Sequence, residues 1–154
     1  MAHLLSSFFV GILTVFSFMM APAMAAGTSD GSSTEAATVS VYDEAKAMVD
    51  EGNFAAALPK LVNLTKMDAQ NADAWNLLGF TYRKLGQLDD SDKAYLTVLS
   101  INPDHLGALE YQGELFITTG KIDLAKANLA KLKALCGTCE QADDLEKALQ
   151  AVGA

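Results

Sequence analysis

The two cysteines of this chain, Cys136 and Cys139, lie close enough in sequence to react with one another. The spacing Cys-x-x-Cys occurs in local disulfides, thiol-disulfide exchange enzymes, zinc sites and c-type haem attachment sites. Haem attachment needs a histidine directly after the second cysteine, where this chain has Glu140. A zinc site needs about four ligands, and His105 is the only other candidate in the part expected to fold. We therefore expect neither haem nor zinc at this pair.

The position of the pair favours a disulfide over an exchange site. An exchange cysteine normally begins a helix after a strand, where the positive end of the helix dipole favours the thiolate. Cys136 is instead expected to end a helix, and the acidic residues Glu140, Asp143 and Asp144 crowd Cys139. We predict a disulfide between the two cysteines, and a thiol-disulfide exchange helper built on them is the alternative.

The remaining titratable side chains form no catalytic arrangement. Asp89, Asp90 and Asp92 fall in the predicted first turn of a helix, where carboxylates interact favourably with the helix dipole. His3 and His105 are not paired with a cysteine or serine that could act as a nucleophile. The sequence therefore predicts no catalytic, cofactor-binding or metal-binding residue, and we expect a protein that is not an enzyme.

The composition is that of an acidic globular protein. Of the 154 residues, 51% are hydrophobic and 19% are charged, and the formal net charge is −8. Every charged side chain lies at or after Asp30. An acidic chain lacks the positive charge that attracts a nucleic-acid backbone or an anionic lipid surface, so we expect no nucleic acid as a partner.

The uncharged N-terminal part is organised like a secretory signal peptide. The apolar run 4–20 is followed by Ala23 and Ala25, the small residues of a cleavage site. We predict a signal peptide over residues 1–25, a flexible linker over 26–37, and a periplasmic or secreted protein. The run is near the lower length limit for a membrane-spanning helix, so a membrane anchor facing the periplasm is the alternative, and only then would the membrane be a partner.

Three glycines recur at an interval of 34 residues, at Gly52, Gly86 and Gly120. Each is followed by a polar and then an apolar residue, so one turn is repeated three times. Apolar residues on both sides of each glycine recur every three or four positions, which predicts helices and argues against strands. The predicted helices are 39–51, 54–65, 72–85, 88–100, 106–119 and 122–135, followed by an amphipathic helix over 140–152.

A helical hairpin of 34 residues resembles the tetratricopeptide repeat, and the middle unit carries that family's pattern in Trp75, Leu78, Gly79, Tyr82, Gly86, Tyr95 and Pro103. The resemblance implies an all-α protein with three helix-turn-helix repeats, over 38–71, 72–105 and 106–139, and a capping helix and tail over 140–154. Such repeats would stack into a right-handed superhelical solenoid. Gly79 and Gly113 would lie inside helices, where glycine costs about 1 kcal/mol relative to alanine, so we expect close helix contacts there.

In this family the first helix of each pair lines a concave groove that binds peptides. Counted from Trp75, the groove-facing residues are Val39, Tyr42, Lys46, Val49, Asp73, Asn76, Phe80, Arg83, Gly107, Glu110, Glu114 and Ile117. The resemblance implies that a peptide would contact Tyr42, Lys46, Asn76, Phe80, Arg83, Glu110 and Glu114.

The charges of this set change sign along the expected groove. Lys46 and Arg83 belong to the first two repeats, and Glu110 and Glu114 belong to the third. This separation of charge would orient a bound segment. The family's chaperone-tail binders hold a peptide carboxylate with a set of Lys and Asn residues that this chain lacks. The sequence thus predicts an exported adaptor or assembly factor that binds a protein or peptide other than a chaperone tail.

The predicted cleavage site can be tested directly. Because the small residues end at Ala25, mass spectrometry of the native protein should show a chain that begins within a residue or two of Ala26. Recovery of an intact Met1 from a washed soluble fraction would contradict export with cleavage.

Overall fold

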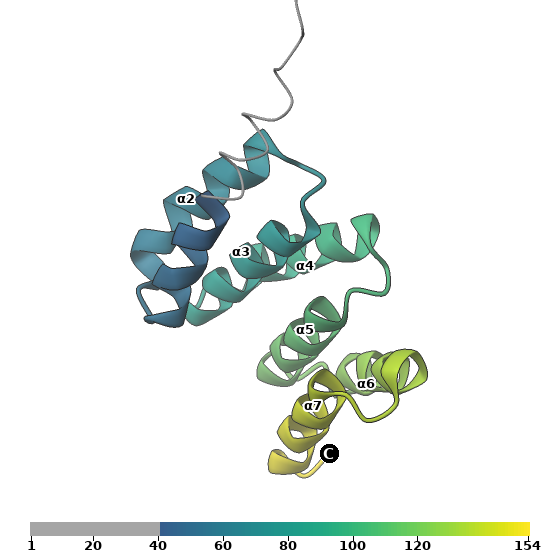
Figure 1. The fold of residues 1–154 in the computed structure, drawn as a ribbon. Helices are drawn as coiled ribbons and strands as arrows, with labels where there is room; N and C mark the ends of the chain where they lie inside the picture. Colours follow the sequence, from purple (N-terminus) through teal and green to yellow (C-terminus); the bar gives the residue numbers. More distant parts are fainter. Residues whose placement is uncertain (1–40) are drawn as a thin grey trace, which may run out of the picture.

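The computed structural model describes residues 41–154, so the predicted signal peptide (1–25) and linker (26–37) lie outside the described residues. Residues 41–50 are helical. Six further helices follow: α2 (Phe54–Met67), α3 (Ala72–Lys84), α4 (Leu88–Ile101), α5 (Leu106–Thr118), α6 (Ile122–Cys136) and α7 (Glu140–Ala151). Figure 1 shows them as helical hairpins stacked in chain order, with α7 at the end of the stack. Residues 41–154 contain no strand, so the all-α prediction is confirmed.

The repeated glycines close three equivalent turns. Gly52, Gly86 and Gly120 have φ angles of 77°, 77° and 73°, a left-handed conformation that glycine adopts without strain. The residue after each glycine donates its backbone N–H to a carbonyl five residues earlier, at 2.8, 2.9 and 2.7 Å. This is the hydrogen bond of a Schellman motif, which satisfies a carbonyl at the end of a helix. The same turn conformation and hydrogen bond therefore recur every 34 residues.

The hydrophobic core runs from one hairpin to the next in three clusters. The first joins residues 41–50, α2 and α3; the second joins α4 and α5; and the third joins α5, α6 and α7. Their largest fully buried side chains are Leu61, Tyr95, Val98, Leu115, Leu132 and Leu145. Each hairpin is therefore stabilised mainly by burial against its neighbours, as in other repeat proteins.

The C-terminal helix α7 covers the last hairpin, as predicted. Ala142, Leu145 and Leu149 are buried in the third cluster. Val152, which the sequence pattern placed on the same face, lies beyond the end of α7 and is 54% exposed. Within residues 41–154, no helix is both long enough and apolar enough to cross a membrane.

Gly79 lies where α3 presses against α4. A Cβ atom built on Gly79 would lie 2.6 Å from Cε1 and 2.8 Å from Cδ1 of Tyr95, which is fully buried. Ser91, also buried, donates a hydrogen bond of 2.8 Å from its Oγ to the carbonyl oxygen of Gly79. The predicted close contact is confirmed, and the Tyr95 ring occupies the volume that any side chain at position 79 would need.

The packing at Gly79 makes a prediction that opposes helix propensity. Gly79→Ala should lower the free energy of unfolding by about 1 to 3 kcal/mol, because the new methyl group overlaps a ring that cannot move away. Urea unfolding followed by circular dichroism measures the effect. Ala127→Gly, at an exposed position of α6, is the control for propensity and should cost about 1 kcal/mol. A Gly79→Ala variant more stable than wild type would contradict the packing argument.

Candidate functional site

An aromatic row crosses three helices of the first, second and third hairpins. The ring centroids of Phe54 in α2 and Phe80 in α3 lie 6.1 Å apart, and those of Phe80 and Tyr111 in α5 lie 5.0 Å apart. All three side chains are only partly buried. The row therefore offers rigid apolar surface that could contact another molecule.

Arg83 is fixed against this row. Its guanidinium carbon lies 5.4 Å from the centroid of Phe80 and 5.8 Å from that of Tyr111, within the range of cation-π contacts. One terminal nitrogen pairs with Glu114 Oε2 at 2.5 Å. The side chains of Arg83 and Glu114 are 14% and 27% exposed, so this pair is partly shielded from solvent.

The ion pair changes the predicted electrostatics of the site. Arg83 and Glu114 were expected at opposite ends of a groove, but the structure brings them together, so their charges largely cancel. Lys46 pairs with Asp50 in the same helix, at 2.6 Å, and both side chains are exposed. The basic end that the sequence suggested is therefore mostly neutralised.

Glu110 is the buried acidic residue of the site. It is 8% exposed, and within residues 41–154 its carboxylate makes no ion pair or hydrogen bond. Its pKa is raised to about 7, mainly by burial and secondly by the nearby carboxylates of Glu114, Asp144 and Glu140. Arg83 opposes these effects, but less strongly. The α5 and α7 side of the site therefore gathers several carboxylates, of which Asp144 is paired with Lys147 at 2.8 Å.

The other predicted residues are placed less uniformly. Tyr42 is half-buried, and burial followed by the charge of Asp73 in α3 raises its pKa. Asn76 lies against the start of α5, where a Cβ atom built on Gly107 would be 3.1 Å from the Nδ2 of Asn76. The Oδ1 of Asn76 is buried and has no hydrogen-bond partner in the described part of the chain.

His105 directly precedes α5 and links it to α3. Its Nδ1 accepts a hydrogen bond from the N–H of Ala108, so Nε2 carries the proton that is donated to Asp73 at 3.0 Å.

Some groove-facing positions inferred from the repeat pattern are not on this surface. Val49 is 6% exposed and belongs to the first core cluster, and Ile117 packs against the third. Both lie near the C-terminal end of a first helix. Val39 lies outside the described residues.

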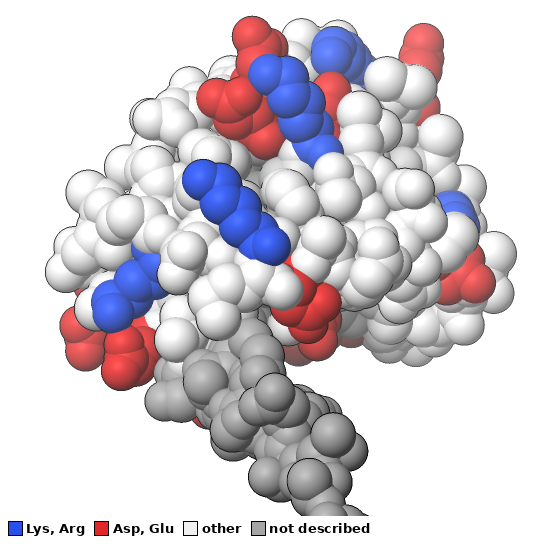
Figure 2. All heavy atoms as spheres, turned by 90° about the horizontal axis from the view of Figure 1, so that it is seen from above, with Lys and Arg blue, Asp and Glu red and all other residues white. Residues whose placement is uncertain are grey.

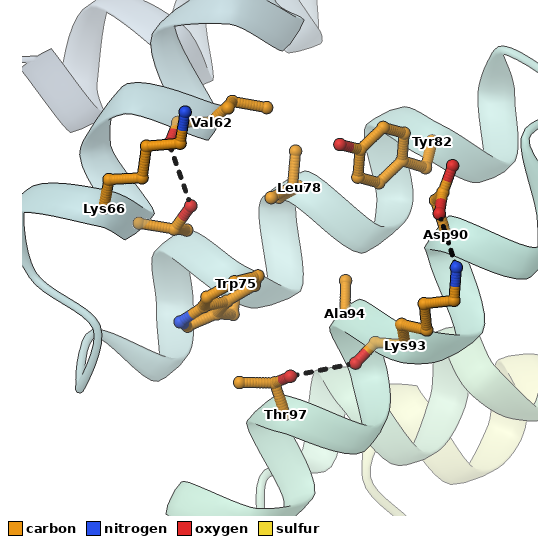
Figure 3. Close-up of a pocket in the computed structure, with 10 residues that line it drawn as sticks. Val62, Lys66, Trp75, Leu78, Tyr82, Asp90, Lys93, Ala94 and Thr97 are labelled. Atoms are coloured by element: carbon orange, nitrogen blue, oxygen red, sulfur yellow. Dashed lines mark hydrogen bonds and ion pairs between the residues drawn. The ribbon is translucent and has the colours of Figure 1, made fainter.

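Sequence reasoning missed two features. Tyr111 was not in the predicted set, although it completes the aromatic row; an aromatic residue beside Glu110 was the available signal. A cavity of about 320 Å³ between α2, α3 and α4 was also missed, since no single motif marks it. Figure 3 shows it bordered by Val62 and Lys66 on one side and by Lys93 and Thr97 on the other.

The cysteines lie at a helix junction. Cys136 is the last residue of α6, Cys139 directly precedes α7, and Gly137 between them has a φ of 68°. Their sulfur atoms are 2.05 Å apart, which is bonding distance. Within residues 41–154, no group of three or more His, Cys, Asp or Glu side chains is placed to hold a metal ion.

The charged surface shows no large patch of one sign on the face in Figure 2, where acidic and basic side chains lie next to one another. Exposed ion pairs of the described residues also include Lys133 of α6 with Glu146 of α7, at 2.7 Å. A surface with mixed charges has no strong attraction for a polyanion.

Comparisons with known proteins identify the repeats. The family described as tetratricopeptide repeat matches residues 48–113. No curated protein matches the chain.

Solved structures share the fold at low sequence identity. The first tetratricopeptide domain of Spaghetti (RPAP3), bound to an HSP90 peptide, is 15% identical and covers 76% of this chain and 94% of its own, with a TM-score of 0.67. The Arabidopsis OM64 tetratricopeptide domain is 14% identical, with a TM-score of 0.70, and the match covers 77% of this chain and 98% of that domain. The Yersinia enterocolitica type III secretion chaperone SycD, in complex with a peptide of the translocator YopD, is 16% identical, with a TM-score of 0.66. The match covers 74% of this chain and 90% of the SycD chain. These similarities establish the fold.

The raised pKa of Glu110 predicts how stability depends on pH. Below pH 4.5 Glu110 is protonated in both the folded and unfolded states, and between pH 4.5 and about 7 only the unfolded state releases its proton. Glu110 therefore contributes a loss of stability as the pH rises through this window.

Glu110→Gln should remove that loss. At pH 8 the variant should be more stable than wild type by about 1 to 2 kcal/mol, and near pH 4 the two should be equal. Urea unfolding at both pH values measures this, with Glu51→Gln at an exposed turn position as the control. A difference between Glu110→Gln and wild type that does not change with pH would contradict the assignment.

Proposed function

Residues 48–113 belong to the tetratricopeptide repeat family, and from that premise we propose that the chain is an adaptor or assembly factor that binds a peptide segment in a concave groove. The groove would be lined by residues 41–50, α3 and α5, the first helices of the three pairs. Proteins with this fold include one bound to an HSP90 peptide and one bound to a YopD peptide, which supports a protein-binding role here.

The aromatic row is the observation that carries the proposal. Phe80 and Tyr111 lie on two of the three first helices, are only partly buried, and are held in place by Arg83. Rigid aromatic side chains lose little entropy on binding and commonly contribute the largest part of peptide affinity. We therefore assign apolar side chains of the peptide to Phe80 and Tyr111.

Charge would then select among apolar peptides. Arg83 and Glu114 neutralise one another, and Asp144 is paired with Lys147. The net charge of the site therefore comes from Glu140 and from the ionised fraction of Glu110. A basic side chain of the peptide would be favoured at this end, next to α5 and α7. Tyr42, Lys46 and Asn76 would contact the opposite end of the segment.

Export remains part of the proposal. The N-terminal sequence supports a periplasmic or secreted protein with cleavage near Ala25, and a membrane anchor facing the periplasm is the alternative. In an oxidising compartment, a disulfide between Cys136 and Cys139 would join α6 to α7 and act as a structural clip. The position of Cys136 at the negative end of α6 supports the clip over thiol exchange.

Binding at the aromatic row can be tested with a matched pair of truncations. A partner captured from the envelope extract is titrated calorimetrically against each variant after circular dichroism confirms folding. Phe80→Ala should weaken binding by about 2 kcal/mol or more. Leu96→Ala, at a 56% exposed position of α4, is the control and should bind like wild type. Wild-type affinity in both Phe80→Ala and Tyr111→Ala would place the binding site elsewhere.

The clip makes a separate prediction. The isolated protein should contain no free thiol, and a Cys136→Ala, Cys139→Ala variant should fold and bind its partner normally while losing about 2 kcal/mol of stability at most, because the closed loop is short. Thiol titration and thermal melting provide the measurements. A normal fold with loss of partner binding, or exchange activity in wild type that the variant lacks, would favour the thiol-exchange alternative.

A further inference from the structure

The cavity between α2, α3 and α4 is separate from the proposed peptide site. It is lined from α3 by Trp75, Leu78 and Tyr82. With about 3.6 residues per helical turn, these residues lie on a different side of α3 from Phe80 and Arg83. A molecule in the cavity would therefore leave the aromatic row free.

The inner surface of the cavity is mostly apolar. Leu78 and Ala94 are buried at its centre, and Val62 and the Trp75 ring flank them. The volume of about 320 Å³ is at the lower end of the range of roughly 300 to 1,000 Å³ for small-molecule sites. One aromatic ring with a short side chain, or an aliphatic chain of similar size, matches such a volume.

Four of the polar residues that line the cavity already have partners within the protein. Lys93 is paired with Asp90 at 2.9 Å, so these two charges cancel. Thr65 and Thr97 donate their hydroxyl groups to backbone carbonyls of their own helices, at 3.2 and 2.9 Å. Each of these four residues therefore already has a partner within the protein.

Two hydrogen-bond donors remain. Lys66 has no ion pair or hydrogen bond within residues 41–154, and the hydroxyl group of Tyr82 points into the space between α2 and α4 without a partner there (Figure 3). A cation and a hydroxyl group beside an apolar surface are complementary to a carboxylate attached to an apolar body.

We propose that this cavity binds a small apolar carboxylate, an aryl-alkyl or alkyl carboxylic acid in its ionised form. The apolar body lies against Trp75, Leu78 and Ala94, and the carboxylate accepts hydrogen bonds from Lys66 and Tyr82. The site joins α2 of the first hairpin to α3 and α4 of the second, so occupancy stabilises the contact between two repeats.

The single tryptophan of the chain reports on the site directly, because Trp75 lines the cavity. Phenylpropionate is titrated into the full-length protein while Trp75 emission is recorded. Phenylpropanol has nearly the same shape without the charge, and phenylpropylamine has the opposite charge. We expect a saturable change with phenylpropionate, binding weaker by about fivefold or more with phenylpropanol, and no saturation with phenylpropylamine. Raising the salt concentration should weaken phenylpropionate binding.

Three variants locate the binding site. Thr97→Phe fills the cavity and should abolish the saturable change. Lys66→Gln removes the unpaired cation from an exposed position, leaves the fold intact, and should weaken phenylpropionate binding by about threefold to tenfold without affecting phenylpropanol. Lys126→Gln, at an exposed position of α6 far along the chain, is the matched control and should bind like wild type.

Any one of three results would overturn the proposal. No saturable change, equal affinity for phenylpropionate and phenylpropanol, or wild-type binding in both Thr97→Phe and Lys66→Gln would each exclude a carboxylate site in this cavity. Tighter binding of a short peptide ending in phenylalanine than of phenylpropionate would replace the small molecule with a chain terminus as the occupant. None of these outcomes depends on the peptide site at Phe80.

Discussion

The contact of a large side chain with a helical glycine is the constraint on which the rest of the structure depends. Gly79 and Gly113 occupy the same position in successive repeats, and the buried side chains of Tyr95 and Leu145 fill the space beside them. Without a Cβ at these positions, α3 approaches α4 and α5 approaches α7 closely enough to bury a continuous core. The spacing of the helices, and therefore the aromatic row and the cavity, follows from these contacts.

The two contacts differ in where the bulky side chain comes from. Tyr95 belongs to the second helix of the same hairpin as Gly79, but Leu145 belongs to α7, outside the hairpin of Gly113. The capping helix therefore completes the packing of the last repeat instead of merely shielding it. This arrangement also brings Glu140 and Asp144 of α7 toward Glu110, so the packing of α7 sets the electrostatics of the proposed peptide site.

The fold was predictable from the sequence because its signals are local and repeated. Helix periodicity and three equivalent glycine turns located each described helix to within about two residues. The site was less predictable, since counting along helices gives the direction of a side chain but not its partner. Positions counted along the helices predicted Arg83 and Glu114 at opposite ends of the groove, whereas the structure pairs them. The same counting predicted that Val49 faces the groove, whereas it is buried in the core. The cavity depends on the distance between α2 and α4, a quantity that no single segment encodes.

The way in which α7 ends the stack also bears on self-association. A hairpin that lacks a neighbour presents an apolar face to which the hairpin of another molecule could add, and repeated addition would produce a filament. Here α7 turns Ala142, Leu145 and Leu149 inward, and its outer side carries exposed charges such as Asp143 and Lys147. Stacking another hairpin there would require desolvation of these charges. The described end of the solenoid is therefore protected against polymerisation by the same helix that completes its core.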